Sequence, residues 1–400
     1  MNEVRALVEA FDGANRMGER CALATVVSVE GSSYRRAGAR MLVCEDGAST
    51  GTISAGCLEG DVVEHAKRVM RAGEAVLVEY DTASTSDEMA WGLGLGCNGI
   101  VRVLVEPLAP GSLYLKALRR SCDGRGDASV SVATVYQHTP SGTTAAAAAS
   151  IEIGGRLFVS EDGEVRRENL SDEAASLVEG DVRAGAAGVR VYEAAGGSFK
   201  FFVETLSPPV SLVVFGAGHD ALPVVELARA LGWQTEVVDP QARPVSHARF
   251  AMADRVTLSR PEDTGARIRI TPRTLTLLMS HNYSHDLASL RFLLASPARY
   301  IGVMGPRKRT ERMLGDLAAG DDAFSLGEED MTRLHSPAGL DIGANAPTEI
   351  ALSIVAEMRA VLDGRRGGSL RERRGAIHGD SFEREHVALA DGQSRHVAAA

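Results

Sequence analysis

The chain has 400 residues, 44% of them hydrophobic and 24% charged, with 43 Lys and Arg against 53 Asp and Glu for a formal net charge of −10. This length corresponds to two or three domains, the acidic balance and the 5% aromatic content argue against nucleic-acid binding, and no apolar run approaches the roughly 18 residues of a membrane span. The sequence shows no secretory signal and its 5 cysteines form no C-x-x-C pair, so we expect a cytoplasmic protein without a disulfide scaffold.

The first part of the chain predicts a helix followed by a small β-rich unit. The apolar residues Val4, Leu7, Val8 and Phe11 open the sequence at helical spacing. Runs rich in apolar and β-branched residues predict strands at 21–30, 39–47, 75–81 and 98–107. A further helix is predicted after the Gly-rich stretch 51–61, with Gly73 at its end.

This β-rich unit is repeated within the chain. ATV at 24–26 recurs at 133–135, GARMLVCEDG (38–47) recurs as GGRLFVSEDG (154–163), LEGD (58–61) as VEGD (178–181), and VRVLVEPL (101–108) as FKFFVETL (199–206). Because the order is kept, we predict a first, cysteine-bearing domain at 1–110 and a degenerate second copy at 111–207. The repeated segment of the second copy, 129–207, contains no cysteine, so we expect the chemistry to lie in the first copy.

The last half of the chain predicts a doubly wound parallel sheet. Pro208 and Pro209 mark its start, since neither can donate to a sheet ladder. Short apolar strands then alternate with helical stretches up to residue 363, and 364–400 reads as a charged, loosely ordered tail. The predicted fold class is therefore α/β, with a C-terminal Rossmann-like sheet and an N-terminal β-rich α+β domain that contains an internal duplication.

A glycine-rich loop follows the first strand of the predicted Rossmann domain. VVFGAGHDA places Gly216, Gly218 and Ala221 in a G-x-G-x-x-A spacing between a strand and a helix, which is typical of a phosphate-binding turn. His219 lies inside this loop, where it either reaches a ligand or caps the helix. Asp239 ends the next strand, at the position from which an acid accepts a hydrogen bond from a ribose. We assign these residues to cofactor binding.

Two further loops follow later strands of this predicted domain. Because ligands of doubly wound sheets bind at the carboxyl ends of the strands, we assign His281 and Asp286 of HNYSHD to cofactor binding. Arg307 and Arg309 of GVMGPRKRT form a candidate anion clamp, with a solvated basic turn as the alternative. His281 and His285 have metal-ligand spacing, but no helix is predicted around both and no further ligand is evident, so we predict no metal site.

Two cysteines of the first copy are the candidate reactive groups. Cys57 lies in SAGCLEGD and Cys97 in GLGCNG, and the glycines beside both expose the sulfur and let a ligand approach the backbone. A buried structural thiol is the alternative for each. The occurrence of both within glycine-rich segments of one copy favours contact with a cofactor or with transferred sulfur.

These segments resemble a known family. GSSYRRAGARMLV, GTISAGCLEGD and GLGLGCNG are similar to the N-terminal signature of the XdhC/CoxI family, and VVFGAGHDALPVVELARALGW, SHNYSHD, ARYIGVMGPRKR and LHSPAGLDIGANAPTEIALSIVAEM to its C-terminal Rossmann part. The resemblance implies a maturation factor that binds molybdenum cofactor (molybdopterin), protects it while its terminal sulfur is added, and helps to insert it into a xanthine-dehydrogenase-type molybdoenzyme. It further implies a homodimer and a cysteine desulfurase as a second partner.

Two other functions stay open at this point. The Rossmann loop and Asp239 also fit an enzyme, an NAD(P)-dependent oxidoreductase with His281 or His285 as its acid or base. Alternatively, the Rossmann domain is a non-catalytic adaptor that docks a molybdoenzyme without a ligand of its own. The motifs outside the Rossmann domain favour a cofactor chaperone over a turnover enzyme.

Overall fold

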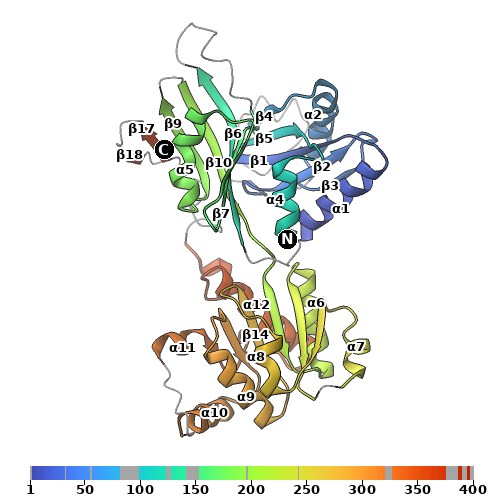
Figure 1. Ribbon diagram of the computed structural model, residues 1–400, viewed down its shortest axis with the longest axis vertical. Helices are drawn as coiled ribbons and strands as arrows, with labels where there is room; N and C mark the ends of the chain where they lie inside the picture. The colour runs from blue at the N-terminus through green and yellow to red at the C-terminus, as the bar shows by residue number, and fades with distance from the viewer. Residues whose placement is uncertain are drawn as a thin grey trace. The chain divides into compact units, whose positions relative to one another are not determined.

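The computed structural model of the chain (Figure 1) describes residues 2–31, 33–54, 56–81, 99–122, 128–140, 153–194, 197–241, 243–319, 327–374, 386–389 and 394–396. These residues form two compact units. The first contains the described residues between Glu3 and Pro208 and the short segments after Arg374, and the second is Pro209–Arg374. The chain therefore passes from one unit to the other at the two adjacent prolines.

The first unit contains the two copies that the repeated sequence predicts. The first copy consists of α1 (Asn2–Arg16), β1 (Cys21–Gly31), β2 (Arg40–Cys44), β3 (Ser49–Gly51), α2 (Glu59–Ala72), β4 (Val76–Asp81) and β5 (Gly99–Pro107). The second consists of α4 (Leu113–Cys122), β6 (Val130–Pro140), β7 (Arg156–Ser160), β8 (Val165–Glu168), α5 (Asp172–Arg183), β9 (Gly188–Ala194) and β10 (Gly197–Leu206). The helix α4 is not among the predicted elements, and it is the counterpart of α1.

Both copies fold into antiparallel sheets with the same strand order. The first sheet runs β3-β2-β1-β5-β4, and the second contains the equivalent series β8-β7-β6-β10-β9. A β-bulge interrupts the central ladder of each copy, between Val26 and Ser28 in the first and between Lys200 and Phe201 in the second. The duplication is therefore present in the pairing of the strands as well as in the sequence.

Apolar side chains on both faces of β1 explain why its sequence is almost continuously hydrophobic. Ala22 and Ala24 pack in a core beneath α2, whereas Cys21 and Leu23 face a second core that contains residues of α1, α4 and both sheets. In the second copy α5 covers the outer face in the way α2 does in the first (Figure 1). Strands buried on both sides lose the alternation of a half-exposed sheet.

Two reciprocal ion pairs join the copies. Arg40 of β2 pairs with Glu204 of β10, and Arg156 of β7 pairs with Glu106 of β5, so equivalent positions exchange partners across the junction. All four side chains are at least 90% buried. Tyr114 of α4 lies between the pairs: its hydroxyl accepts a hydrogen bond from Arg40 Nη2 at 2.8 Å and donates one to Glu204 at 2.8 Å. The Arg156 guanidinium lies 3.9 Å from the centre of the Tyr114 ring.

The second unit is a doubly wound parallel sheet of six strands, β13-β12-β11-β14-β15-β16. Its elements are β11 (Ser211–Phe215), η1 (His219–Ala221), α6 (Leu222–Ala230), β12 (Gln234–Asp239), α7 (Val245–Arg249), β13 (Arg255–Leu258), η2 (Pro261–Asp263), α8 (Thr264–Arg267), β14 (Thr274–Leu278), α9 (Tyr283–Leu294), β15 (Tyr300–Val303), α10 (Arg307–Ala319), α11 (Glu328–Arg333), β16 (Leu334–His335) and α12 (Pro347–Leu362). Helices α6 and α12 cover one face, and α9 and α10 the other. The predicted fold class is confirmed.

The predicted tail contributes three short elements. These are η3 (Leu370–Glu372), β17 (His386–Leu389) and β18 (Ser394–His396). The strand β17 pairs in parallel with β9 at the edge of the second sheet, and β18 extends that edge. Within the described residues, no helix has the length and apolar content needed to cross a membrane.

Candidate functional site

The candidate residues fall into two groups, one in each unit. The first is the loop that carries Cys57, between β3 and α2. The second is the edge of the parallel sheet where its strands end, with the glycine-rich loop and the residues after β14 and β15. Cys97, the other candidate of the first unit, lies outside the described residues.

A single hydroxyl organises the Cys57 loop. Ser54 Oγ accepts hydrogen bonds from the backbone N–H groups of Gly56 at 3.2 Å, Cys57 at 3.1 Å and Leu58 at 3.1 Å. These are donors that precede and begin a helix and have no partner within it. The backbone on both sides of the sulfur is therefore fixed before any ligand binds.

The carboxylate of Glu59, the first residue of α2, fixes the same loop. It accepts hydrogen bonds from Thr52 Oγ1 at 2.6 Å, from the Ser54 N–H at 2.9 Å and from the Ser54 hydroxyl. Burial raises the pKa of Glu59, but the hydrogen bonds from Ser54 and Thr52 outweigh it and lower the pKa to about 2. The counterpart in the second copy, Glu179, bonds an arginine of its own helix instead, so this network belongs to the cysteine-bearing copy.

The Cys57 thiol is more accessible than the pair in the sheet beneath it. Cys57 is half-buried, whereas Cys21 and Cys44 are buried and lie opposite each other on β1 and β2. Burial raises the pKa of both Cys21 and Cys44, which makes their thiols poor nucleophiles. An added Cβ at Gly56, whose φ is +106°, would meet no atom of the described residues within 4 Å, so the backbone beside Cys57 is open to a ligand.

The low pKa of Glu59 predicts a pH-dependent contribution to stability. Because the folded-state pKa is about 2 and the ordinary value is 4.5, folding favours the carboxylate, and this stabilisation is lost as the pH falls from 4.5 towards 2. We expect Glu59→Gln to lower the free energy of unfolding by about 1 kcal/mol at neutral pH, after allowance for solvent screening. Urea unfolding at several pH values should show this deficit shrinking below pH ~4.5. Glu179→Gln, the matched control, removes only an exposed pair with Arg183 and should cost less at neutral pH.

The glycine-rich loop of the second unit needs small residues at Gly216 and Ala221, whereas Gly218 lies beneath a side chain. Gly216 has φ +139°, and an added Cβ would lie 2.4 Å from the carbonyl oxygen of Met279. Ala221 is fully buried where α6 begins, so only a small residue lets the helix pack on the sheet. His219 is exposed. Gly218 has no positive φ, and its neighbour is the Asp220 side chain, which bends back over the loop.

A histidine–carboxylate pair crosses this loop. His281 Nε2 lies 2.6 Å from Asp220 Oδ2, with the histidine side chain 62% exposed and the aspartate 27%. His281 lies in the loop between β14 and α9 and has φ +57°, a left-handed conformation that non-glycine residues adopt rarely. The pair places an acidic group over the turn where a Rossmann domain binds a pyrophosphate. It therefore works against an anionic ligand at this position.

Asp239 lies at the end of β12 but faces its own loop. It is fully buried, and it accepts hydrogen bonds from the N–H of Gln241 at 2.9 Å, from Arg243 Nε at 3.1 Å and from Ser246 Oγ at 2.6 Å. Burial raises the pKa of Asp239, but these hydrogen bonds outweigh it and lower the pKa. A ribose hydroxyl would reach this carboxylate only if the loop opened, so the structure gives no support for an NAD-type site.

Asp286 and Arg309, predicted separately, are partners. Asp286 is 99% buried in the first turn of α9 and accepts hydrogen bonds from Ser280 Oγ at 2.6 Å and Arg309 Nη2 at 2.7 Å. Arg309 is therefore held by the protein. Arg307 and Lys308 are exposed at the start of α10, and in the described part of the chain no hydrogen bond or ion pair ties them down. Arg307 and Lys308 are therefore the predicted cations that remain accessible to an anion at the carboxyl edge of the parallel sheet.

Taken together, the first unit holds a fixed, glycine-flanked thiol and the second is a Rossmann domain with an altered phosphate-binding turn. The protein therefore combines a β-rich domain that carries an accessible thiol with a Rossmann domain. The family models match both parts: the XdhC and CoxI family at residues 14–81 and the XdhC Rossmann domain at residues 212–358. The chain belongs to the XdhC and CoxI family.

Individual relatives agree with this assignment. A protein of Bacillus subtilis described as a probable subunit of xanthine dehydrogenase is 31% identical over 85% of this chain and 92% of its own length. The molybdenum cofactor insertion chaperone PaoD of Escherichia coli is 22% identical over 86% of this chain and 84% of its own. A crystal structure described as a xanthine dehydrogenase from Bacillus halodurans is 30% identical with a TM-score of 0.69, covering 94% of this chain and 99% of that one.

Proposed function

We propose that the protein is an accessory factor of a xanthine-dehydrogenase-type molybdoenzyme. It binds molybdenum cofactor as its cargo, holds it while a partner cysteine desulfurase supplies the terminal sulfur, and aids its insertion into the enzyme. Membership of the XdhC and CoxI family supports this role, as do the names of two relatives, a molybdenum cofactor insertion chaperone and a probable subunit of xanthine dehydrogenase.

The observation that carries the proposal is the Cys57 loop. A thiolate is a soft ligand suited to a molybdenum centre, and it is also the group that accepts sulfur in exchange chemistry. Ser54 and Glu59 hold the loop, and Gly56 leaves its backbone open. A site prepared in this way binds without an ordering cost. We assign Cys57 and Cys97 to contact with the cofactor or its sulfur.

The second unit has exposed cations of its own that suit an anionic ligand. Arg307 and Lys308 are exposed at the start of α10 and carry the positive charge that a phosphate needs. Arg309 positions this turn through Asp286. The His281–Asp220 pair must part, or the ligand must avoid the turn at Gly216, for an anion to bind there. This geometry favours a cargo site over an oxidoreductase that uses NAD(P).

Cofactor content tests the proposal. The protein is expressed in a host that makes molybdopterin and purified rapidly, and molybdenum and oxidised-pterin fluorescence are assayed together. We expect near-stoichiometric pterin in the wild type, and a loss of about tenfold or more in Cys57→Ala and Cys97→Ala. Cys122→Ala, in α4, is the control and should retain the cofactor. An adaptor without a ligand predicts no pterin in any variant, and co-purified NAD(P) with turnover would establish the oxidoreductase instead.

A further inference from the structure

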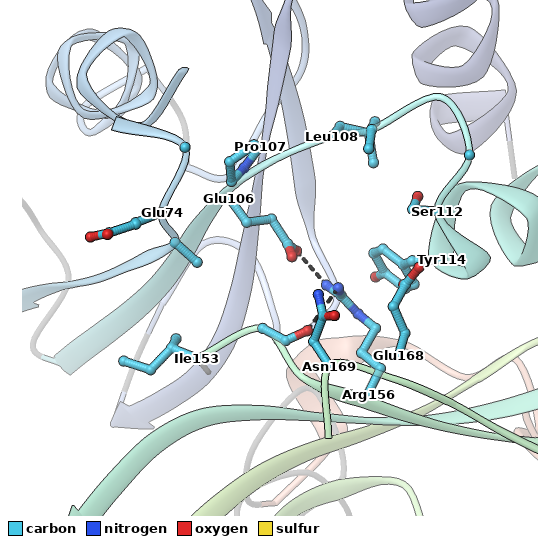
Figure 2. Close-up of a pocket in the computed structure, with 15 residues that line it drawn as sticks. Glu74, Glu106, Pro107, Leu108, Ser112, Tyr114, Ile153, Arg156, Glu168 and Asn169 are labelled. Atoms are coloured by element: carbon cyan, nitrogen blue, oxygen red, sulfur yellow. Dashed lines mark hydrogen bonds and ion pairs between the residues drawn. The ribbon is translucent and has the colours of Figure 1, made fainter. Parts of the chain in front are cut away.

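The junction between the two copies contains an open cavity that the proposed function does not use. Its volume is about 630 Å³, within the range of small-molecule sites. Segments from both copies line it: the connection from α2 to β4, the connection from β5 to α4, the start of β7, and the end of β8 (Figure 2). The repeat thus creates a pocket that neither copy contains alone.

One wall of the cavity is a buried guanidinium between two carboxylates. Arg156 is 95% buried, donates to Glu106 and to the carbonyl of Gly154, and stacks on the ring of Tyr114. Among the described residues, its Nε has no hydrogen-bond partner. Burial works to lower the pKa of Arg156, but Glu106 and the more distant Glu168 outweigh it and the pKa is raised.

Two further polar side chains of the cavity lining, Glu168 and Asn169, can form hydrogen bonds with a ligand. Glu168 receives the N–H of Leu113 on Oε1, and within the described residues no hydrogen bond reaches its Oε2. Asn169 has φ +50° and also lines the cavity, where it is exposed (Figure 2). Glu74 lies on the rim, and its carboxylate points away from this centre (Figure 2).

The remaining lining is mixed, with Ser112 as a polar residue and Pro107, Leu108 and Ile153 as apolar ones. Pro107 ends β5 and Leu108 follows it, while Ile153 precedes β7. An arginine, an asparagine and a glutamate are the side chains with which proteins bind the edges of nucleobases: arginine donates to a carbonyl, asparagine donates and accepts, and glutamate accepts an N–H. The excess of carboxylate disfavours an anion, and Pro107, Leu108 and Ile153 offer apolar surface to the face of a flat ring.

We propose that this cavity binds a fused pyrimidinone, a flat bicycle in which ring N–H groups stand beside a carbonyl. Glu168 Oε2 accepts a ring N–H, Asn169 pairs with the lactam, and Arg156 donates to a carbonyl. Oxopurines and oxopteridines share this chemistry. The oxopteridine case rests on the proposed function, since it would place the ring of the cofactor, whereas the oxopurine case does not.

Calorimetry on the full chain tests the inference with xanthine and pterin as probes. Caffeine, the trimethylated xanthine without a ring N–H, is the matched control ligand. We expect xanthine, pterin or both to bind more tightly than about 1 mM and caffeine to bind at least about tenfold more weakly. Glu168→Gln, which keeps the bond to Leu113, and Asn169→Gly, which keeps the left-handed backbone, should each weaken binding about tenfold. Glu74→Gln should leave it unchanged.

Several results would overturn the inference: no binding of either probe at about 1 mM, equal binding of caffeine, or wild-type affinity in both Glu168→Gln and Asn169→Gly. Circular dichroism of each variant shows whether it is folded. The cofactor content of purified Glu168→Gln separates the two proposals. Normal content with lost xanthine binding supports a distinct purine site, and loss of both pterin binding and cofactor content supports a site for the pterin ring.

Discussion

Removal of the Glu204 carboxylate should destabilise the first unit severely. Glu204→Ala leaves Arg40, which is 93% buried, without its ion pair. It also removes the carboxylate that accepts the hydrogen bond from the Tyr114 hydroxyl. Breaking a buried pair by removing one partner costs about 3–5 kcal/mol, because the remaining charge is buried and uncompensated. We therefore expect a loss of this size in the free energy of unfolding, measured by urea denaturation of the full chain.

The chain supplies both an equivalent pair and an exposed one for comparison. Glu106→Ala removes the partner of Arg156 at the related position and should cost a similar amount. Glu164→Ala removes an ion pair with Arg166 whose side chains are 52% and 59% exposed, and it should cost less than about 1 kcal/mol. If Glu204→Ala were no more harmful than Glu164→Ala, the junction would not depend on the buried pairs.

The two reciprocal ion pairs fix the position of one copy relative to the other. Each arginine follows a left-handed glycine, Gly38 or Gly154, whose carbonyl it also binds. A shift of one copy against the other would break both ion pairs together, and each broken pair leaves a buried charge. Hydrophobic contacts alone, such as those of Val27 and Phe202 at this junction, tolerate such shifts more easily.

The repeat was visible in the sequence, but the contacts between its copies were not. GARMLV and GGRLFV contain Arg40 and Arg156 at matching places, and VLVEPL and FFVETL contain Glu106 and Glu204. The pairing runs across the copies, over 164 residues for Arg40 and Glu204, so no local pattern reports it. The helix α4 was missed although its buried residues Tyr114, Leu115 and Leu118 stand at helical spacing. Only its role, placing Tyr114 between the two pairs, depends on the tertiary structure.

The candidate sites show the same division. Strand ends and glycine spacing placed Gly216, Asp239 and Asp286 at the carboxyl edge of the parallel sheet, because these features follow from local geometry. The side-chain partners of these residues could not be predicted from local geometry. His281 meets Asp220 from 61 residues away, and Asp239 is occupied by its own loop. Ser54 and Glu59 were not predicted as part of the Cys57 loop, although they lie within the segment GTISAGCLEGD, where a hydroxyl and a carboxylate at the start of a helix are signals for capping.

Substitution of Gly216 should have the second large effect, and it separates the structural role of this glycine from ligand binding. Gly216 has φ +139°, and a Cβ would lie 2.4 Å from the Met279 carbonyl oxygen and 2.6 Å from its carbon, both part of the backbone. Backbone strain and forced displacement each cost about 1–3 kcal/mol. We expect Gly216→Ala to lower the free energy of unfolding by about 3 kcal/mol or more.

Gly218→Ala is the matched control, since it adds the same methyl group to the same loop. Its nearest neighbour would be the Asp220 carboxylate, which can rotate away, and its backbone has no positive φ. We expect a cost below about 1 kcal/mol, with the bond between Asp220 and His281 broken. Equal costs at both positions would contradict the described path of the loop. A large cost at Gly216 alone would show that this glycine is required where the loop passes β14, whether or not a phosphate binds, so the motif by itself is no evidence for a nucleotide.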